Sequence, residues 1–212
     1  MREQFSFQEE KDLWNYRSLA TIWLSIYEQQ YSLMDSAQVM VTKIIWDTAF
    51  YWGVFGLLYF HNAFRDIADS PGIAANLTRI AQLSNRIQAF YREWHAIDRS
   101  KISNTYVDLY SPLDFMVKLH TSMAAEMPPS KLAAQFAANV RLFERLAGQI
   151  ISTVIEAYAD DFENEDALDQ IQHWQTDPYI ADLIVQYRRE GKDTSTGEWI
   201  MVGRREMQEV VG

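Results

Sequence analysis

Apolar side chains recur at intervals of three or four residues along two long stretches of this 212-residue sequence, residues 73–97 and 132–158. Such intervals place the apolar side chains on one face of an α-helix. The two sets are Ile73, Leu77, Ile80, Leu83, Ile87, Phe90, Trp94 and Ile97, and Leu132, Phe136, Val140, Phe143, Ala147, Ile150, Val154 and Tyr158. Two such faces bury each other when the helices run nearly parallel or antiparallel. We therefore predict an all-α helical bundle.

Capping residues and prolines indicate where the helices begin. Ser6 and Glu9 have the spacing of a capping box, which opens a helix expected to end near Leu33. A second helix is expected to start at Asp35 or Ser36 and to continue to about Asp69. Proline lacks an N–H, which costs nothing in the first turn of a helix because that N–H would have no partner within the helix. The preceding side chain can cap the free amides of the turn. This pattern marks three later starts at Ser70-Pro71, Ser111-Pro112 and Asp177-Pro178, and Pro128-Pro129-Ser130 ends one helix and starts another.

These signals divide the chain into two parts. Residues 1–190 are expected to form a bundle of about six to seven helices. Residues 191–212 are expected to form a short irregular C-terminal tail, in which Trp199–Val202 is a candidate short strand. A chain of this length suits one domain with a small appendage.

Composition excludes several classes of function. The chain contains no cysteine, which removes disulfides, thiolate nucleophiles and cysteine-based metal sites and is typical of a reducing compartment. The N-terminal residues 1–12 lack the apolar core of a secretory signal, so we expect a cytoplasmic protein. The net charge is −10 and there is no basic run, which argues against nucleic acid as a partner. Much of this charge comes from nine acidic residues between Arg145 and Arg188.

Residues 44–60, IIWDTAFYWGVFGLLYF, are apolar enough to raise the question of a membrane span. Over residues 39–60, the ten Leu, Ile, Phe and Val side chains contribute about −3 to −6 kcal/mol to insertion. At the centre of a bilayer, Lys43 and Asp47 together would oppose insertion by roughly 5–7 kcal/mol. No basic residues flank the segment to fix its orientation in a membrane. We therefore predict a core helix and no transmembrane span.

The same helix carries a polar stripe when its residues are spaced at 100°. The opposite side has small residues, Ala49, Gly53 and Gly56, which would let another helix approach closely. One interpretation of the stripe is an i, i+4 ion pair between Lys43 and Asp47 with solvated ends. The other is one wall of an aromatic cleft, where polar groups hydrogen-bond a ligand. The candidate ligand-binding residues are Lys43, Trp46, Asp47, Tyr51, Trp52, His61 and Arg65.

No complete catalytic or metal-binding motif occurs. None of the four histidines follows a glutamate by three residues, as a di-iron bundle requires. The acidic run YADDFENEDALD, residues 158–169, offers Asp160, Asp161 and Glu165 as weak Mg²⁺ ligands of the isoprenoid-synthase type. Its other interpretation is a solvated loop that supplies Asn164 or Glu165 to start the next helix. There is no Gly-x-Ser-x-Gly, Gly-x-Gly-x-x-Gly or P-loop sequence.

Basic side chains gather on one predicted helix. Residues 73–98 carry Arg79, Arg86 and Arg92 but only two acids, Glu93 and Asp98. This helix could hold an anionic ligand, or its arginines could pair with the acidic part of the same chain.

Two phrases, SIYEQQYSLMDSAQVMVTKIIWDTAFYWGVFGLLYFHNAF and LSNRIQAFYREWHAID, resemble the helical C-terminal part of bacterial FAD-dependent oxidoreductases. These enzymes are relatives of the flavin-dependent halogenases and geranylgeranyl reductases, and the likeness spans about residues 14–98. The resemblance implies helices that cover the substrate side of a flavin domain. The chain departs from the family in lacking the glycine fingerprint and the Trp-x-Trp-x-Ile-Pro motif. We therefore expect no cofactor in this chain, with FAD present only if a partner domain supplies it.

The leading functional hypothesis is a helical substrate-covering or interaction domain. It would bind a flat apolar ligand, aromatic or prenyl, or a partner chain that carries the flavin. One alternative is a stand-alone helical enzyme that acts on an isoprenoid-type substrate through residues 160–166. The other is a homo-oligomeric scaffold, such as a homodimer, whose aromatic residues pack in an interface.

Overall fold

The computed structural model describes residues 20, 23–24, 26–27, 30–63, 70–99 and 114–190. Within them the predicted all-α bundle is confirmed, and no strand occurs in these ranges. Several predicted features lie outside the described residues: the capping box at Ser6, the start at Ser111-Pro112, Arg65 and the whole tail with its candidate strand. The division at residue 190 therefore stays a prediction.

The bundle is built around three long helical rods. The first comprises α2 (Ala37–Phe50), a π-helical turn η2 (Tyr51–Gly56) and α3 (Leu57–Phe60). The other two are α4 (Pro71–Ile97) and α6 (Pro129–Tyr158). The shorter elements are η1 (Tyr31–Leu33), α5 (Asp114–Ala124), α7 (Glu165–Thr176) and α8 (Pro178–Glu190).

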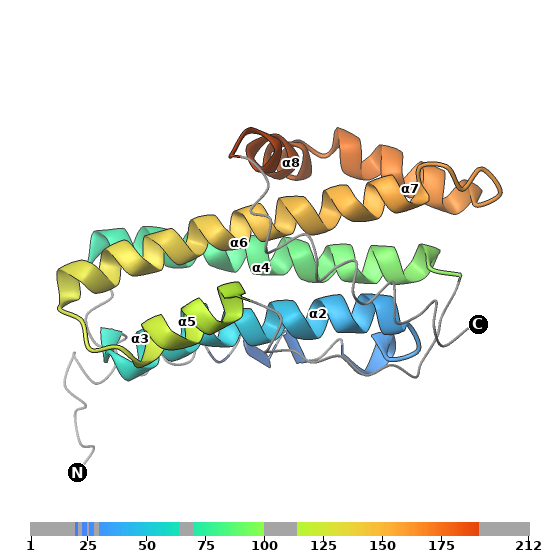
Figure 1. Cartoon of the computed structure of the whole chain (residues 1–212). Coiled ribbons are helices and arrows are strands. Elements are labelled where there is room, and N and C mark those ends of the chain that lie inside the picture. The colour runs from blue at the N-terminus through green and yellow to red at the C-terminus, as the bar shows by residue number, and fades with distance from the viewer. Residues whose placement is uncertain are drawn as a thin grey trace, which may run out of the picture.

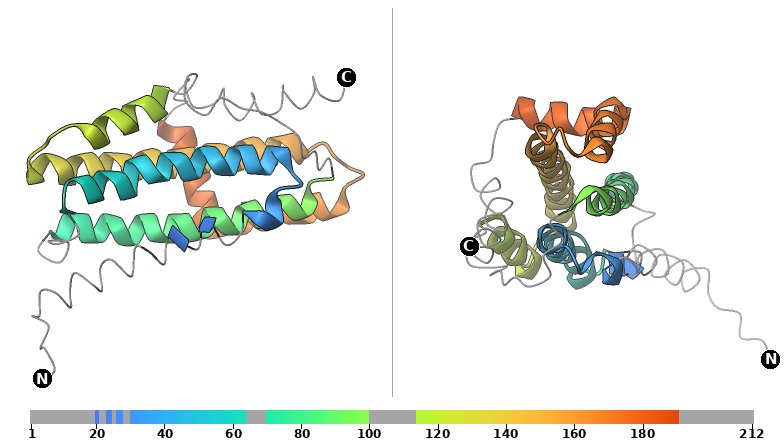
Figure 2. Two further views of the ribbon diagram at one scale, coloured as in Figure 1. Left: turned by 90° about the horizontal axis from the view of Figure 1, so that it is seen from below. Right: turned by 90° about the vertical axis from the view of Figure 1, so that its right-hand side faces the viewer.

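The three rods lie side by side, with α5 along the η2–α3 end of the first rod (Figure 1). The views in Figure 2 show α7 and α8 on the outer side of α6, where α8 crosses α6 at a steep angle. Gly148 permits this crossing. A Cβ atom at Gly148 would lie 2.9 Å from Cβ of Tyr187 and still closer to the carbonyl oxygen of Leu183.

The predicted helix starts are largely confirmed. Pro71, Pro129 and Pro178 each open a helix, as their lack of an N–H favours. Ser36 Oγ accepts a hydrogen bond from Val39 N at 3.3 Å and Asn164 Oδ1 accepts one from Ala167 N at 3.3 Å, so both residues cap the following helix. Asp177 Oδ1 accepts hydrogen bonds from Tyr179 N at 2.9 Å and Ile180 N at 3.2 Å. Ser70 differs from the prediction, because its side chain makes no capping hydrogen bond in the described structure.

The second helix was predicted to continue to about Asp69, and this end point is wrong. The rod ends at Phe60, and the chain turns through His61 and Asn62. Asn62 has φ of 52°, a left-handed conformation that asparagine tolerates better than most residues. A residue in this conformation ends a helix.

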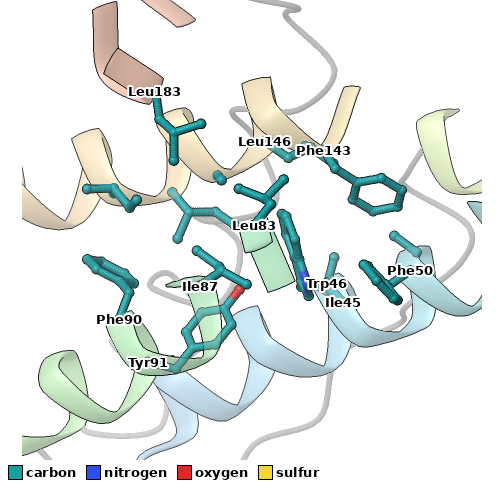
Figure 3. Close-up of a cluster of buried hydrophobic side chains, with 14 of the residues drawn as sticks. Ile45, Trp46, Phe50, Leu83, Ile87, Phe90, Tyr91, Phe143, Leu146 and Leu183 are labelled. Atoms are coloured by element: carbon teal, nitrogen blue, oxygen red, sulfur yellow. The ribbon is translucent and has the colours of Figure 1, made fainter. Parts of the chain in front are cut away.

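The core lies where the predicted stripes of α4 and α6 face each other and the first rod. All the predicted stripe positions are buried except Leu77 and Tyr158, which are partly buried. Figure 3 shows Leu83, Ile87 and Phe90 of α4 in one cluster with Phe143 and Leu146 of α6. Each fully buried side chain of this size contributes roughly 1.5–3 kcal/mol to folding.

Among the described residues, none of the helices is both sufficiently long and sufficiently apolar for a bilayer crossing. The interpretation of residues 39–60 as a core helix agrees with their burial, since Ile45, Trp46, Phe50 and Leu57 are each at most 1% exposed.

Candidate functional site

Lys43 and Asp47 form the predicted i, i+4 ion pair, but the pair is buried rather than solvated. Lys43 is 0% exposed and Asp47 is 7% exposed. Lys43 Nζ donates to Asp47 Oδ2 at 2.5 Å and to the carbonyl oxygen of Ile26 at 2.9 Å. Gln88 Nε2, on α4, donates to Asp47 Oδ1 at 3.0 Å. The pair is therefore enclosed where α2, α4 and the helical turn around Ile26 meet.

Burial dominates the electrostatics of this pair. It raises the pKa of Asp47 and lowers the pKa of Lys43, because a low-dielectric interior disfavours both charges. The attraction and hydrogen bond between the two groups oppose both shifts. Tyr91, on α4, is also buried, and burial together with the nearby Asp47 charge raises its pKa well above the usual value. The pair joins helices, and its charges are closed to solvent.

Trp46 lies in the core rather than beside an open cleft. It is 1% exposed and packs edge-to-face on Phe143 of α6, with ring centroids 5.2 Å apart. Figure 3 shows its indole between α2 and the helices that carry Leu83 and Phe143. Trp46 thus serves helix packing in the described structure.

Tyr51 and Trp52 belong to a separate aromatic group on the π-helical turn. Their rings are 4.7 Å apart, and Trp52 also lies 4.7 Å from the ring of His120 on α5. Tyr51 is 37% exposed, and its ring lies 5.5 Å from Trp23. The structure therefore brings Tyr51 and Trp52 together at the surface of the bundle, while Trp46 packs inside it.

The glycines of the π-helical turn let side chains of neighbouring helices approach closely, as the small-residue pattern predicted. A Cβ atom at Gly53 would lie 2.9 Å from the Phe143 ring, and one at Gly56 would lie 2.5 Å from Sδ of Met123. The Gly53 carbonyl accepts a hydrogen bond from Nδ2 of buried Asn139 at 2.8 Å. The π turn was not predicted. It is a backbone irregularity of a kind that recurs at functional sites.

A cavity of about 820 Å³ lies at the end of this rod, where the α5–α6 connection passes α3. His61 lines it and is half-buried. Its Nδ1 is 2.7 Å from the Leu57 carbonyl oxygen and its Nε2 is 2.8 Å from that of Ala125. The remaining lining residues are Phe60, Asn62, Met123, Ala124, Ala125, Glu126, Met127 and Pro128. Of the predicted ligand-binding residues within the described ranges, which leave out Arg65, His61 is the one that lines this cavity.

The acidic run spans the end of α6, the turn that follows it and the start of α7. Asp160 and Asp161 lie in that turn, Glu165 begins α7, and Asn164 supplies its cap, as one interpretation predicted. No group of three or more His, Asp or Glu side chains in the described ranges is placed to hold a metal ion.

Two arginines of α4 pair with acidic groups of neighbouring elements. Arg79 binds both carboxylate oxygens of Glu144, at 2.7 and 2.8 Å, and Arg86 forms an ion pair with Asp177. Arg86 also lies over the ring of Tyr179, 5.4 Å from its centroid. These contacts favour intramolecular pairing over an anion site for these two arginines.

Sequence reasoning missed the methionines of the cavity. Met123 and Met127 flank a connection whose only sequence signal was the Pro128-Pro129 helix boundary. Nothing in that signal indicated that the connection would pack against His61.

Comparisons of the chain with protein-family models, with curated proteins and with solved structures give no match. The resemblance to FAD-dependent oxidoreductases therefore stays a prediction.

Proposed function

We propose that this chain is a helical binding domain that holds a flat, largely apolar ligand in the cavity between α3 and the α5–α6 connection. The observation that supports the proposal is the cavity itself, whose volume of about 820 Å³ lies in the range typical of small-molecule sites. The Lys43–Asp47 pair is enclosed, so the ligand site is assigned to the opposite end of the same rod.

The side chains of the cavity suit an aromatic or prenyl ligand. Phe60 offers a flat ring that is 60% exposed, on which an aromatic or unsaturated ligand can stack. Met123 and Met127 are flexible, polarisable and able to fit apolar ligands of irregular shape. Asn62 and Glu126 supply polar atoms on the rim, which would orient a hydroxyl or amine.

Substitution of Phe60 tests this site. Phe60→Ser removes the stacking surface from a largely exposed position, so the fold should survive. The matched control is Phe162→Ser, because Phe162 is 75% exposed in the α6–α7 turn and does not line the cavity. We expect indole, 2-naphthol or farnesol to raise the melting temperature of the unchanged protein without added metal. Phe60→Ser should weaken binding by about 1.5 kcal/mol, roughly tenfold in Kd.

The outcome is read by titration calorimetry on the three proteins. No binding of any compound, or equal weakening by Phe60→Ser and Phe162→Ser, would contradict the proposed site. Light scattering on the same samples tests the alternative of a homo-oligomeric scaffold, which predicts a stable oligomer and no ligand response. FAD added alone should give no melting shift, since we expect no cofactor site in this chain unless a partner domain supplies the FAD.

A further inference from the structure

Two helical segments end at the cavity, and each brings its carbonyl end there. The first rod ends at Phe60 and α5 ends at Ala124, and both residues line the cavity. The last carbonyl groups of an α-helix have no partner within the helix, so this end carries a partial negative charge. The ring of His61 shows how close the two ends lie, because its nitrogens are 2.7 Å from the Leu57 carbonyl oxygen and 2.8 Å from that of Ala125. Two negative helix ends therefore meet at one cavity.

A carboxylate adds to the negative charge of these helix ends. Glu126 lines the cavity and is exposed, and His61 is the other ionisable side chain among the described lining residues. In the part of the chain that the structure describes, no lysine or arginine lines the cavity. Lys118 of α5 and Lys131 of α6 are exposed outside it, where water and salt screen their charges. When His61 is neutral, the described side chains of the cavity therefore leave its negative charge unbalanced.

The amino end of α6 also lies beside the cavity, but few of its amides can give it a positive charge. α6 begins at Pro129, directly after the lining residue Pro128. Neither proline has an N–H, and the Lys131 amide donates to the Pro128 carbonyl oxygen at 2.9 Å. Ser130 is left as the remaining one of the four amides that an α-helix leaves unpaired at this end. The α6 end therefore offsets little of the negative charge of the two carbonyl ends.

We propose that the cavity selects apolar ligands that carry a positive charge, such as an amine on an aromatic body, over neutral and anionic ligands of the same shape. The inference rests on the proposed function of the cavity and names the class of its ligand. The ammonium lies toward the helix ends and Glu126, and the apolar body packs on Met123 and Met127. The exposed ring of Phe60 adds to the selection, because the face of an aromatic ring attracts a cation.

Three indole compounds of similar shape test the charge of the ligand. Tryptamine carries an ammonium, tryptophol a hydroxyl and indole-3-acetate a carboxylate. Binding is measured by titration calorimetry at about pH 8, where a primary ammonium stays protonated and histidine is ordinarily neutral. We expect tryptamine to bind about tenfold more tightly than tryptophol, and indole-3-acetate to bind more weakly than either. Raising the salt concentration from about 0.05 M to about 0.5 M should reduce the preference for tryptamine, because salt screens the charges.

Glu126→Gln tests the carboxylate, and Glu163→Gln is the matched control. Both residues are exposed, and Glu163 lies in the α6–α7 turn, at the other end of α6 from the cavity. Glu126→Gln should weaken tryptamine binding about three- to fivefold and leave tryptophol binding unchanged. Glu163→Gln should change the binding of neither compound.

The outcomes separate this inference from the proposed function. If tryptophol or indole-3-acetate binds as tightly as tryptamine, the preference for a cation is overturned, and the cavity remains a site for apolar ligands. If Glu126→Gln and Glu163→Gln weaken tryptamine binding equally, the preference is also overturned, because the Glu126 charge then does not act in the cavity. If none of the three compounds binds, the proposed function of the cavity is overturned, and the inference falls with it.

Discussion

The Lys43–Asp47 pair offers a sharp test of the described packing, because both charges lie inside the bundle. Lys43→Met removes the ammonium and leaves the Asp47 carboxylate, 7% exposed, with Gln88 as its remaining described partner. Removing one member of a buried ion pair costs about 3–5 kcal/mol. For a chain of this size, 1 kcal/mol shifts the melting temperature by about 2–4 °C. We therefore expect a fall of roughly 6–20 °C.

The double variant Lys43→Met/Asp47→Leu should be far less damaging than the sum of its parts. It removes both charges and fills similar volume, a change that is often neutral or stabilising. The Gln88 amide and the Ile26 carbonyl would lose a partner, at about 1–3 kcal/mol for an unsatisfied buried group. A double-mutant cycle should therefore give a coupling energy of at least about 2 kcal/mol.

The pH dependence of this pair has a definite sign. Burial raises the pKa of Asp47, so its contribution to stability is fully present below the unfolded pKa of about 3.9 and is lost as pH rises through the folded pKa. Burial lowers the pKa of Lys43, so its contribution is present above about pH 10.4 and is lost as pH falls through the folded pKa. Relative to the double variant, the unchanged protein should lose stability as pH rises from about 4.

Urea denaturation followed by tryptophan fluorescence measures all of these free energies. Lys118→Met, at an exposed position on α5, is the matched control and should change stability by no more than about 0.5 kcal/mol. Losses of less than about 1 kcal/mol in unfolding free energy in both Lys43→Met and Asp47→Leu, together with additive losses in the double variant, would refute the reasoning. They would mean that water reaches the pair and that α2 does not pack on α4 as described.

Other substitutions test the fold at single positions. Gly148→Ala should destabilise the protein by about 1–3 kcal/mol, because the added Cβ would clash with the backbone of α8. Gly72→Ala should be neutral or stabilising by up to about 1 kcal/mol, because no atom lies within 4 Å of the added Cβ. Thermal melts compare the two variants. The pKa of Asp177 is lowered even though partial burial opposes this, because the Ile180 amide and Arg86 donate hydrogen bonds to it. Its contribution is therefore present above about pH 4 and is lost as pH falls, and acid titration of Asp177→Asn should lack this loss.

The helices of the core were predictable because their signals are local. The stripes of α4 and α6 depend on spacing within one helix, and the caps at Ser36, Asn164 and Asp177 depend on adjacent residues. The end of the first rod was harder to predict. A left-handed asparagine at position 62 leaves a weak sequence signal, and the strong apolar run before it favoured a longer helix.

The candidate site was only partly predictable because it depends on what covers each face. A helical wheel places Lys43, Asp47 and His61 on one stripe, but it does not show that Gln88 closes over Asp47 while the end at His61 stays open. The sequence gives little indication that Gln88 is buried, since it is one polar residue next to the apolar stripe of α4. The cavity arises from a chain reversal after α5, and the distance between the Ala125 carbonyl and His61 depends on tertiary packing.

The two ends of the first rod differ in a way that bears on function. At the α2 end, a buried ion pair and its hydrogen bonds join separate helices, and a change there disturbs several elements at once. At the α3 end, exposed Phe60 and the half-buried His61 border the cavity, where the proposed ligand would bind without unpacking the core. The glycines of the π turn lie between these ends and pack against Phe143 and Met123, so Met123 links the turn to the cavity wall. The proposed binding site would combine the adaptable side chains of Met123 and Met127 with the rigid support of this rod.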